Sequence, residues 1–136
     1  MRVVVTHYGG PEVITTIEED IPVPKAAEVR VKVLAAGVSL PDVLAREGVH
    51  PETPRVPYTP GWDLVGTVDQ LGEGVTGFEP RQTVAAMPIH GCYAQYVCVP
   101  RTLPFSSHAG SAPHDGQLRR SRRGTHVPGT ADAQTG

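Results

Sequence analysis

Residues 29–33 read Val29-Arg30-Val31-Lys32-Val33, and this strict alternation of apolar and charged side chains decides the fold class. A period of two is typical of a strand with one buried and one solvent-facing side. Outward from it lie further short apolar runs, separated by turns rich in Gly and Pro, as in antiparallel barrels and sandwiches. We therefore expect a mainly β fold. Its other strands are expected at residues 3–5, 13–17, 64–71, 83–87 and 93–99.

One short helix interrupts these strands. Ser39-Leu40-Pro41-Asp42 is typical of a helix start, with Ser39 as the cap, Pro41 in the first turn and Asp42 near the positive end of the helix dipole. The helix is expected to end near Gly48.

The chain divides at residue 100. Residues 1–100 carry the periodic apolar pattern and a net charge of −5, whereas residues 101–136 carry +3 and four large apolar side chains without periodicity. Such a segment buries too little surface to offset the entropy of ordering it, about 1–2 kcal/mol per residue. The sequence predicts a domain at 1–100 and a disordered tail at 101–136.

The composition limits the kinds of partner and the cellular compartment that we expect for this chain. The arginine cluster at 119–123 lacks lysines and interleaved aromatics, so nucleic-acid binding is a minor alternative. No apolar run is long enough for a membrane span, and no signal segment precedes the first strand. Cys92 and Cys98 fall on one expected strand, about 20 Å apart, which is too far for a disulfide. We expect a cytoplasmic protein.

Residues 72–77 match G-x-G-x-x-G after a strand, a pattern that phosphate-binding loops use. That chemistry needs a helix beginning inside the motif, so that its amides face the phosphates. Phe78-Glu79-Pro80 follows instead, and the chain soon returns to a strand. We interpret the motif as a turn between strands.

Four segments together resemble a known family. In this order and spacing they are similar to the N-terminal, GroES-like domain of medium-chain dehydrogenase/reductases, in particular the zinc-free NADPH:quinone oxidoreductases. The resemblance implies a partly open β-barrel with a short helix, covering nearly all of residues 1–100. The segments are residues 9–13 (GGPEV), 29–39 (VRVKVLAAGVS), 60–68 (PGWDLVGTV) and 91–96 (GCYAQY).

The resemblance also bears on cofactors. Where zinc-dependent members have a Cys and a His-Glu pair, this chain has Ser39 and Trp62-Asp63, and a hydroxyl and an indole are poor zinc ligands. We expect no zinc. In the intact family a hydride passes from NADPH to a quinone or activated alkene, a small-molecule substrate. We expect no NADPH binding by this chain alone, because it lacks a nucleotide-binding domain.

The cleft residues that the resemblance implies are Ser39 and Asp42 as catalytic residues and His50 and Trp62 as substrate-binding residues. Each has a plainer alternative: helix capping for Ser39, barrel packing for Trp62, and an ordinary loop histidine for His50. Quinone reductases often carry Asn at Ser39. They commonly carry Gly at Arg81, where a positive φ costs other residues about 1–2 kcal/mol.

We expect this chain to be the substrate-side domain of an NADPH-dependent oxidoreductase, inactive alone and prone to self-association through uncovered edges. A frameshift near Pro100 is one explanation of the tail, since suitable codons for residues 100–112 read in another frame continue the family pattern. A native disordered tail is the other. The alternative function is a stand-alone GroES-like binding module without catalysis.

Overall fold

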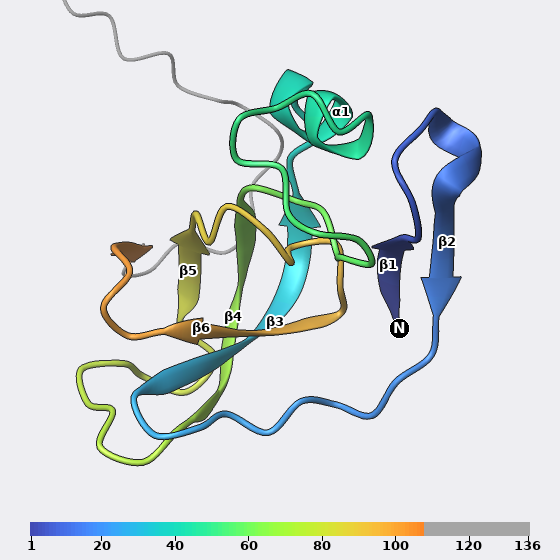
Figure 1. Ribbon diagram of the computed structural model, residues 1–136. Helices are drawn as coiled ribbons and strands as arrows, with labels where there is room; N and C mark the ends of the chain where they lie inside the picture. The colour runs from blue at the N-terminus through green and yellow to red at the C-terminus, as the bar shows by residue number, and fades with distance from the viewer. Residues whose placement is uncertain (108–136) are drawn as a thin grey trace, which may run out of the picture.

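The computed structural model describes residues 1–107 of the chain, as seven strands, one α-helix and one 3-10 turn (Figure 1). Within these residues, no helix is long and apolar enough to cross a membrane. The elements are β1 (Arg2–Val5), η1 (Pro11–Val13), β2 (Ile14–Ile17), β3 (Glu28–Ala36), α1 (Leu40–Arg46), β4 (Leu64–Leu71), β5 (Thr83–Ala86), β6 (Tyr96–Pro100) and β7 (Phe105–Ser107).

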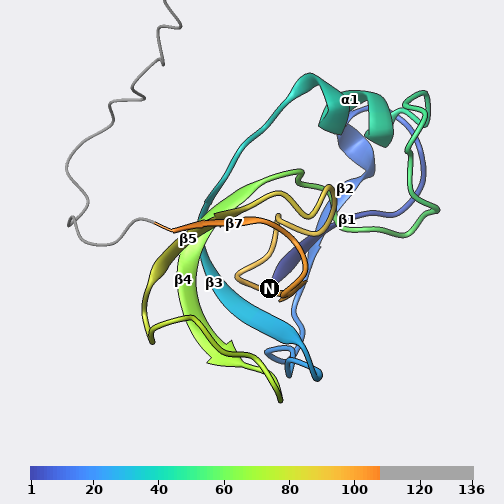
Figure 2. The same ribbon diagram turned by 90° about the vertical axis from the view of Figure 1, so that its left-hand side faces the viewer.

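Five strands form one antiparallel sheet in the order β6-β3-β4-β5-β7. Strands β6 and β7 follow each other in the chain but lie at opposite edges. In a flat sheet those edges would be about 19 Å apart. The connecting residues 101–104 reach at most about 17 Å, and a turn bonding Leu103 N–H to the Pro100 carbonyl shortens that reach. The sheet is therefore curled, as Figure 2 shows, which confirms the partly open barrel.

The inner side of the curled sheet holds the main core. Val29 and Val31 are fully buried while their neighbours Arg30 and Lys32 are not, so the alternation that predicted β3 is confirmed. The core consists of aliphatic side chains and one cysteine, and the partly buried rings of Phe78 and Phe105 pack against it. Its buried members are Val29, Val31, Leu64, Val68, Val75, Val84, Ala86, Cys92 and Val99.

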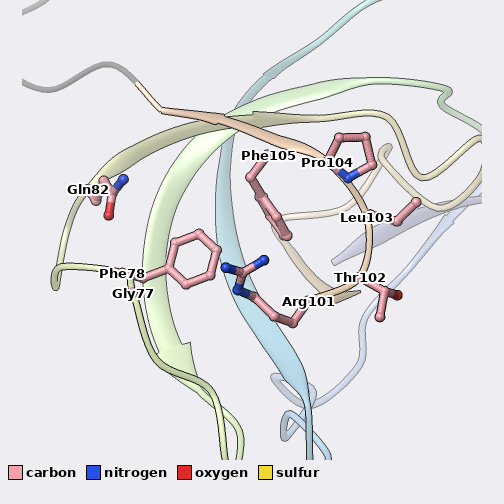
Figure 3. A pocket seen from close by; sticks show the side chains of 8 residues that line it. All are labelled: Gly77, Phe78, Gln82, Arg101, Thr102, Leu103, Pro104 and Phe105. Atoms are coloured by element: carbon pink, nitrogen blue, oxygen red, sulfur yellow. The ribbon is translucent and has the colours of Figure 1, made fainter.

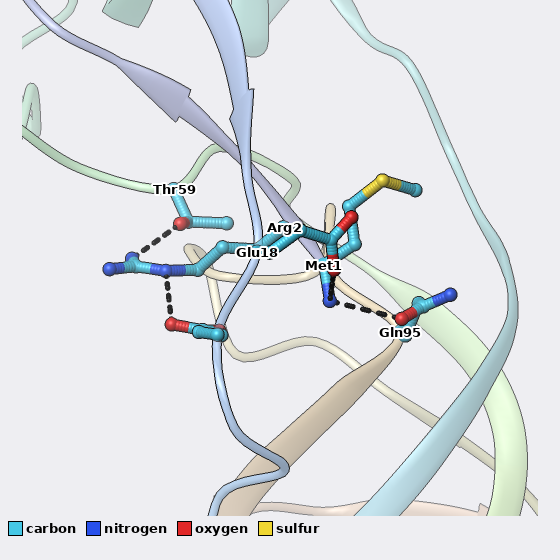
Figure 4. Close-up of polar contacts among 6 residues, drawn as sticks. Met1, Arg2, Glu18, Thr59 and Gln95 are labelled. Carbon is cyan, nitrogen blue, oxygen red and sulfur yellow. Dashed lines mark hydrogen bonds and ion pairs between the residues drawn. The ribbon is translucent and has the colours of Figure 1, made fainter.

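Strands β1 and β2 form a separate two-stranded sheet beside the barrel. A second core cluster of Val5, Val13, Ala45 and Tyr58 packs it against α1. Polar contacts join the start of the chain to two other segments: Arg2 donates to Thr59 Oγ1 at 2.9 Å, and the Met1 ammonium donates to Gln95 Oε1 at 3.0 Å (Figure 4).

Two expectations are corrected. Order does not stop at residue 100: β7 pairs with β5, and Leu103 and Phe105 pack against the main core. Phe105 finds its partner in Phe78 of a distant connection, which local periodicity does not reveal. Cys92 precedes β6 and is not on the same strand as Cys98. The rest of the expected disordered tail, residues 108–136, and with it the arginine cluster at 119–123, lies outside the described residues.

Candidate active site

The N-terminus of α1 is organised by one buried carboxylate. Asp42 Oδ2 accepts hydrogen bonds from the Ser39 backbone N–H at 2.9 Å and from the Ser39 hydroxyl at 2.8 Å. Asp42 Oδ1 accepts from the N–H of Gly61 at 3.1 Å, in the loop just before Trp62. Asp42 is 6% exposed, and its bond to Gly61 is buried, whereas its two bonds to Ser39 are partly buried. One carboxylate thus joins the Ser39 turn to the Trp62 loop.

The segment leading into Ser39 is fixed by two residues from distant parts of the chain. Asp63 Oδ1 accepts the Gly37 N–H at 2.9 Å, and the Tyr93 hydroxyl donates to the Gly37 carbonyl at 3.0 Å. A side chain at Gly37 would collide with the Asp63 carboxylate, which explains why glycine stands there. Ser39 itself is exposed, and the backbone that leads into it is held at Gly37 by these two bonds.

An aromatic group flanks the same loop. The ring of His50 meets that of Trp62 edge to face at a centroid distance of 5.1 Å, and His90 meets Trp62 at 6.1 Å. His50 Nδ1 accepts the Glu52 N–H at 3.1 Å, so a neutral His50 carries its proton on Nε2. Tyr58 contacts His90 in turn at 6.4 Å. The sequence-predicted residues His50 and Trp62 therefore stand together.

Burial shifts the pKa values of two side chains in this region. It is the main cause that raises the pKa of Tyr93 to about 12, and the negative charge of Asp42 adds to it. Burial also lowers the pKa of His90, which favours the neutral imidazole. A mostly apolar hollow of about 200 Å³ lies along α1, between Asp42, Val43, Pro60 and Tyr93. The site keeps its aromatic hydroxyl and His90 uncharged near neutral pH.

The described residues offer few groups that could bind a metal ion or a phosphate. Within residues 1–107, no three His, Cys, Asp or Glu side chains are grouped closely enough to hold a metal ion. Zinc independence stays a prediction. Residues 72–77 form turns between β4 and β5 with no helix following, so the interpretation of this motif as a connection is confirmed.

Four residues of the site were missed from the sequence: Asp63, Tyr93, His90 and Ile89. The first two lie inside segments that carried the family resemblance, but their bonds to Gly37 link residues 26 and 56 positions apart. Ile89 has φ +74, a conformation that a β-branched residue rarely adopts, and its N–H donates to the Trp62 carbonyl. Such strained positions cluster at functional sites. No local pattern signals them.

A curled antiparallel sheet with one short helix, whose cap is tied to a Pro-Gly-Trp loop, defines the class of GroES-like domains. The model of the alcohol dehydrogenase GroES-like domain matches residues 25–109. The chain belongs to this family, and its resemblance to the quinone oxidoreductase branch of the medium-chain dehydrogenase/reductases is confirmed.

The relatives are much longer than this chain. It is 38% identical over 95 residues to a quinone oxidoreductase of Lama guanicoe, covering 68% of this chain and 28% of the relative. A human synaptic vesicle membrane protein VAT-1 homolog-like structure superposes with TM-score 0.73 at 28% identity, covering 78% and 33%. Escherichia coli quinone oxidoreductase, solved with NADPH, superposes with TM-score 0.67 at 27% identity, covering 73% and 30%. The chain thus spans about a third of these proteins.

Proposed function

We propose that this chain is the substrate-side domain of an NADPH-dependent, zinc-independent oxidoreductase that transfers a hydride to a quinone or activated alkene in the cytoplasm. The observation that carries the proposal is the Asp42 carboxylate, which joins Ser39 to the loop of Trp62. Through these bonds, the polar side chain of Ser39 and the aromatic side chain of Trp62 belong to one proposed site. The NADPH-bound quinone oxidoreductase relative supports the cofactor.

The hydrogen bonds suggest a role for each side chain. The Ser39 proton is engaged by Asp42, and the Ser39 oxygen caps α1 by accepting the Asp42 backbone N–H. One lone pair of that oxygen is left to accept a hydrogen bond from a hydroxyl or amide of cofactor or substrate. Asp42 is then a positioning residue. His50 presents Nε2–H as the donor for the oxygen of the reduced quinone, and Trp62 forms a flat wall beside it. NADPH supplies the hydride in the intact enzyme.

The chain alone is expected to be inactive, because residues 1–107 offer no phosphate-binding turn followed by a helix. Its uncovered surface supports self-association. Val38 is 80% exposed, Leu40 68% and Met87 59%, and all four residues of β2 are exposed. Large apolar surface and open strand edges favour contact with another copy.

Fluorescence tests the substrate site directly, because Trp62 is the chain's one tryptophan. Titration with 9,10-phenanthrenequinone should quench it saturably, and NADPH should leave it unchanged. His50→Ala should weaken quinone binding, whereas His7→Ala, on an exposed histidine, should not. Quenching that rises without saturation, as with collisions in solution, contradicts the proposed site.

Activity is tested in a chimera in which residues 1–107 replace the matching segment of E. coli quinone oxidoreductase. NADPH oxidation that depends on added quinone is expected. His50→Ala should lower kcat/KM about a hundredfold or more, the size of effect usual for a lost acid-base or oxyanion donor. A folded, NADPH-binding chimera without turnover would overturn the enzymatic assignment.

The second candidate function is a stand-alone binding module. It is favoured by the closure of the β5 edge by β7, which leaves a sheet with its own core inside the described residues. A monomeric chain in sedimentation velocity with one cooperative unfolding transition supports this candidate. Concentration-dependent association supports the incomplete-enzyme proposal.

A further inference from the structure

A second cavity lies apart from the Ser39 site, between the β4–β5 connection and the β6–β7 link (Figure 3). Its volume is about 440 Å³, within the range of small-molecule sites. The cavity and the Ser39 site lie at different ends of β4, because Trp62 precedes this strand and Phe78 follows it. The cavity also shares no lining residue with the hollow beside α1. It is lined by Gly77, Phe78, Gln82, Arg101, Thr102, Leu103, Pro104 and Phe105.

The apolar part of this cavity is aromatic. Phe78 and Phe105 meet edge to face, with ring centroids 5.1 Å apart and planes at 77°. Figure 3 shows both rings and Arg101 facing one another between the two connections. Leu103 and Pro104 complete the apolar wall. Such walls suit a flat hydrophobic body.

The polar part of the cavity favours an anion. The guanidinium carbon of Arg101 lies 5.0 Å from the centroid of the Phe78 ring. Stacked there, the guanidinium keeps its N–H edges available, and these match a carboxylate in a two-point geometry. Within residues 1–107, no acidic side chain forms an ion pair with Arg101, and none lines the cavity.

Gln82 adds a second donor. Its Oε1 accepts the Glu79 N–H at 2.9 Å, which assigns the amide nitrogen to the other side. We propose that this cavity binds a small aromatic carboxylate, with the carboxylate on Arg101 and the ring against Phe78 and Phe105. The site is separate from the proposed hydride-transfer site, so neither depends on the other.

The test is saturation-transfer NMR on the full chain, which needs only micromolar protein. We expect 2-naphthoate to bind and 2-naphthalenemethanol, its uncharged analogue, to bind at least about tenfold more weakly. Inorganic phosphate alone should not displace the naphthoate. Absence of saturation transfer up to about 5 mM naphthoate, or equal binding of the alcohol, overturns the proposal.

Variants locate the site. Arg101→Gln should weaken naphthoate binding about tenfold or more. The affinity of Arg101→Lys should fall between those of Arg101→Gln and the unmodified chain, because lysine keeps the positive charge but cannot bind the carboxylate in the two-point geometry of a guanidinium. Arg55→Gln is the matched control, since Arg55 is also an exposed arginine. Unchanged binding in Arg101→Gln, with its circular dichroism intact, places the ligand elsewhere and overturns the proposal.

Discussion

Two parts of the domain are fixed in different ways. Around α1, the carboxylates of Asp42 and Asp63 bind backbone N–H groups of Gly61 and Gly37 and hold each loop at defined atoms. Around the β6–β7 link, the rings of Phe78 and Phe105 pack together. We call these the carboxylate-held and the ring-held regions.

The difference follows from what each contact requires. Hydrogen bonds to a carboxylate are directional, so they define atomic positions, as a site for hydride transfer needs. Ring packing is less directional and tolerates many sequences around it. The ring-held region can thus order residues 101–107 although their sequence lacks periodicity.

Removing Asp42 should damage the domain most. Asp42→Ala leaves three donors without their acceptor, two partly buried ones on Ser39 and a buried one on Gly61. We expect a loss of about 3 kcal/mol in the free energy of unfolding, measured in urea. Asp20→Ala, on an exposed carboxylate, should change stability by less than about 0.5 kcal/mol. If Asp42→Ala and Asp20→Ala lowered the free energy of unfolding equally, the Asp42 carboxylate would not be what holds this region.

Phe105→Ala tests the ring-held region. The ring is partly buried, so we expect a smaller loss of about 2 kcal/mol. Hydrogen exchange should quicken at the β5 amides that face β7, while Trp62 fluorescence stays unchanged. Phe105→Leu, which keeps most of the apolar volume, should lose less than half as much. A shift of Trp62 emission in Phe105→Ala would show that the regions are coupled.

The fold was largely predictable, because its strands carry period-two patterns or β-branched runs. Val29 to Val33 and Leu64 to Leu71 form strands as predicted, and the helix begins after Ser39. The three residues of β7 escaped, because a strand that short has no measurable period and depends on Phe78, far away in the sequence.

The candidate site was predictable only through family resemblance. The resemblance implied Ser39, His50 and Trp62 as site residues, and the contact of His50 with Trp62 brings two of them together. The residues that position them act over long sequence distances, so no spacing rule indicates Asp63 or Tyr93. Their roles in catalysis stay predictions.

Arg81→Gly tests strain in the connection that precedes β5. Arg81 has φ +64, as the family's preference for Gly there suggested. Glycine adopts this conformation without the penalty of about 1–2 kcal/mol, although it loses more entropy on folding. We expect a net gain of about 0.5–1 kcal/mol in the urea unfolding free energy. Arg81→Ala removes the same charge but keeps the strain, so a matching gain in that variant would refute the explanation.

Alkaline pH should destabilise the domain, in part through Tyr93 of the carboxylate-held region. The folded pKa of Tyr93 is raised from 10 to about 12, so between these values the unfolded chain loses a proton that the folded chain keeps, and stability falls as pH rises. The buried thiol of Cys92, raised to about 12, adds to this fall. Tyr93→Phe should reduce the slope of unfolding free energy against pH from 10 to 12 without abolishing it. Phe105→Leu, in the ring-held region, should leave that slope unchanged, and an equal slope in Tyr93→Phe and the unmodified chain would place the alkaline sensitivity elsewhere.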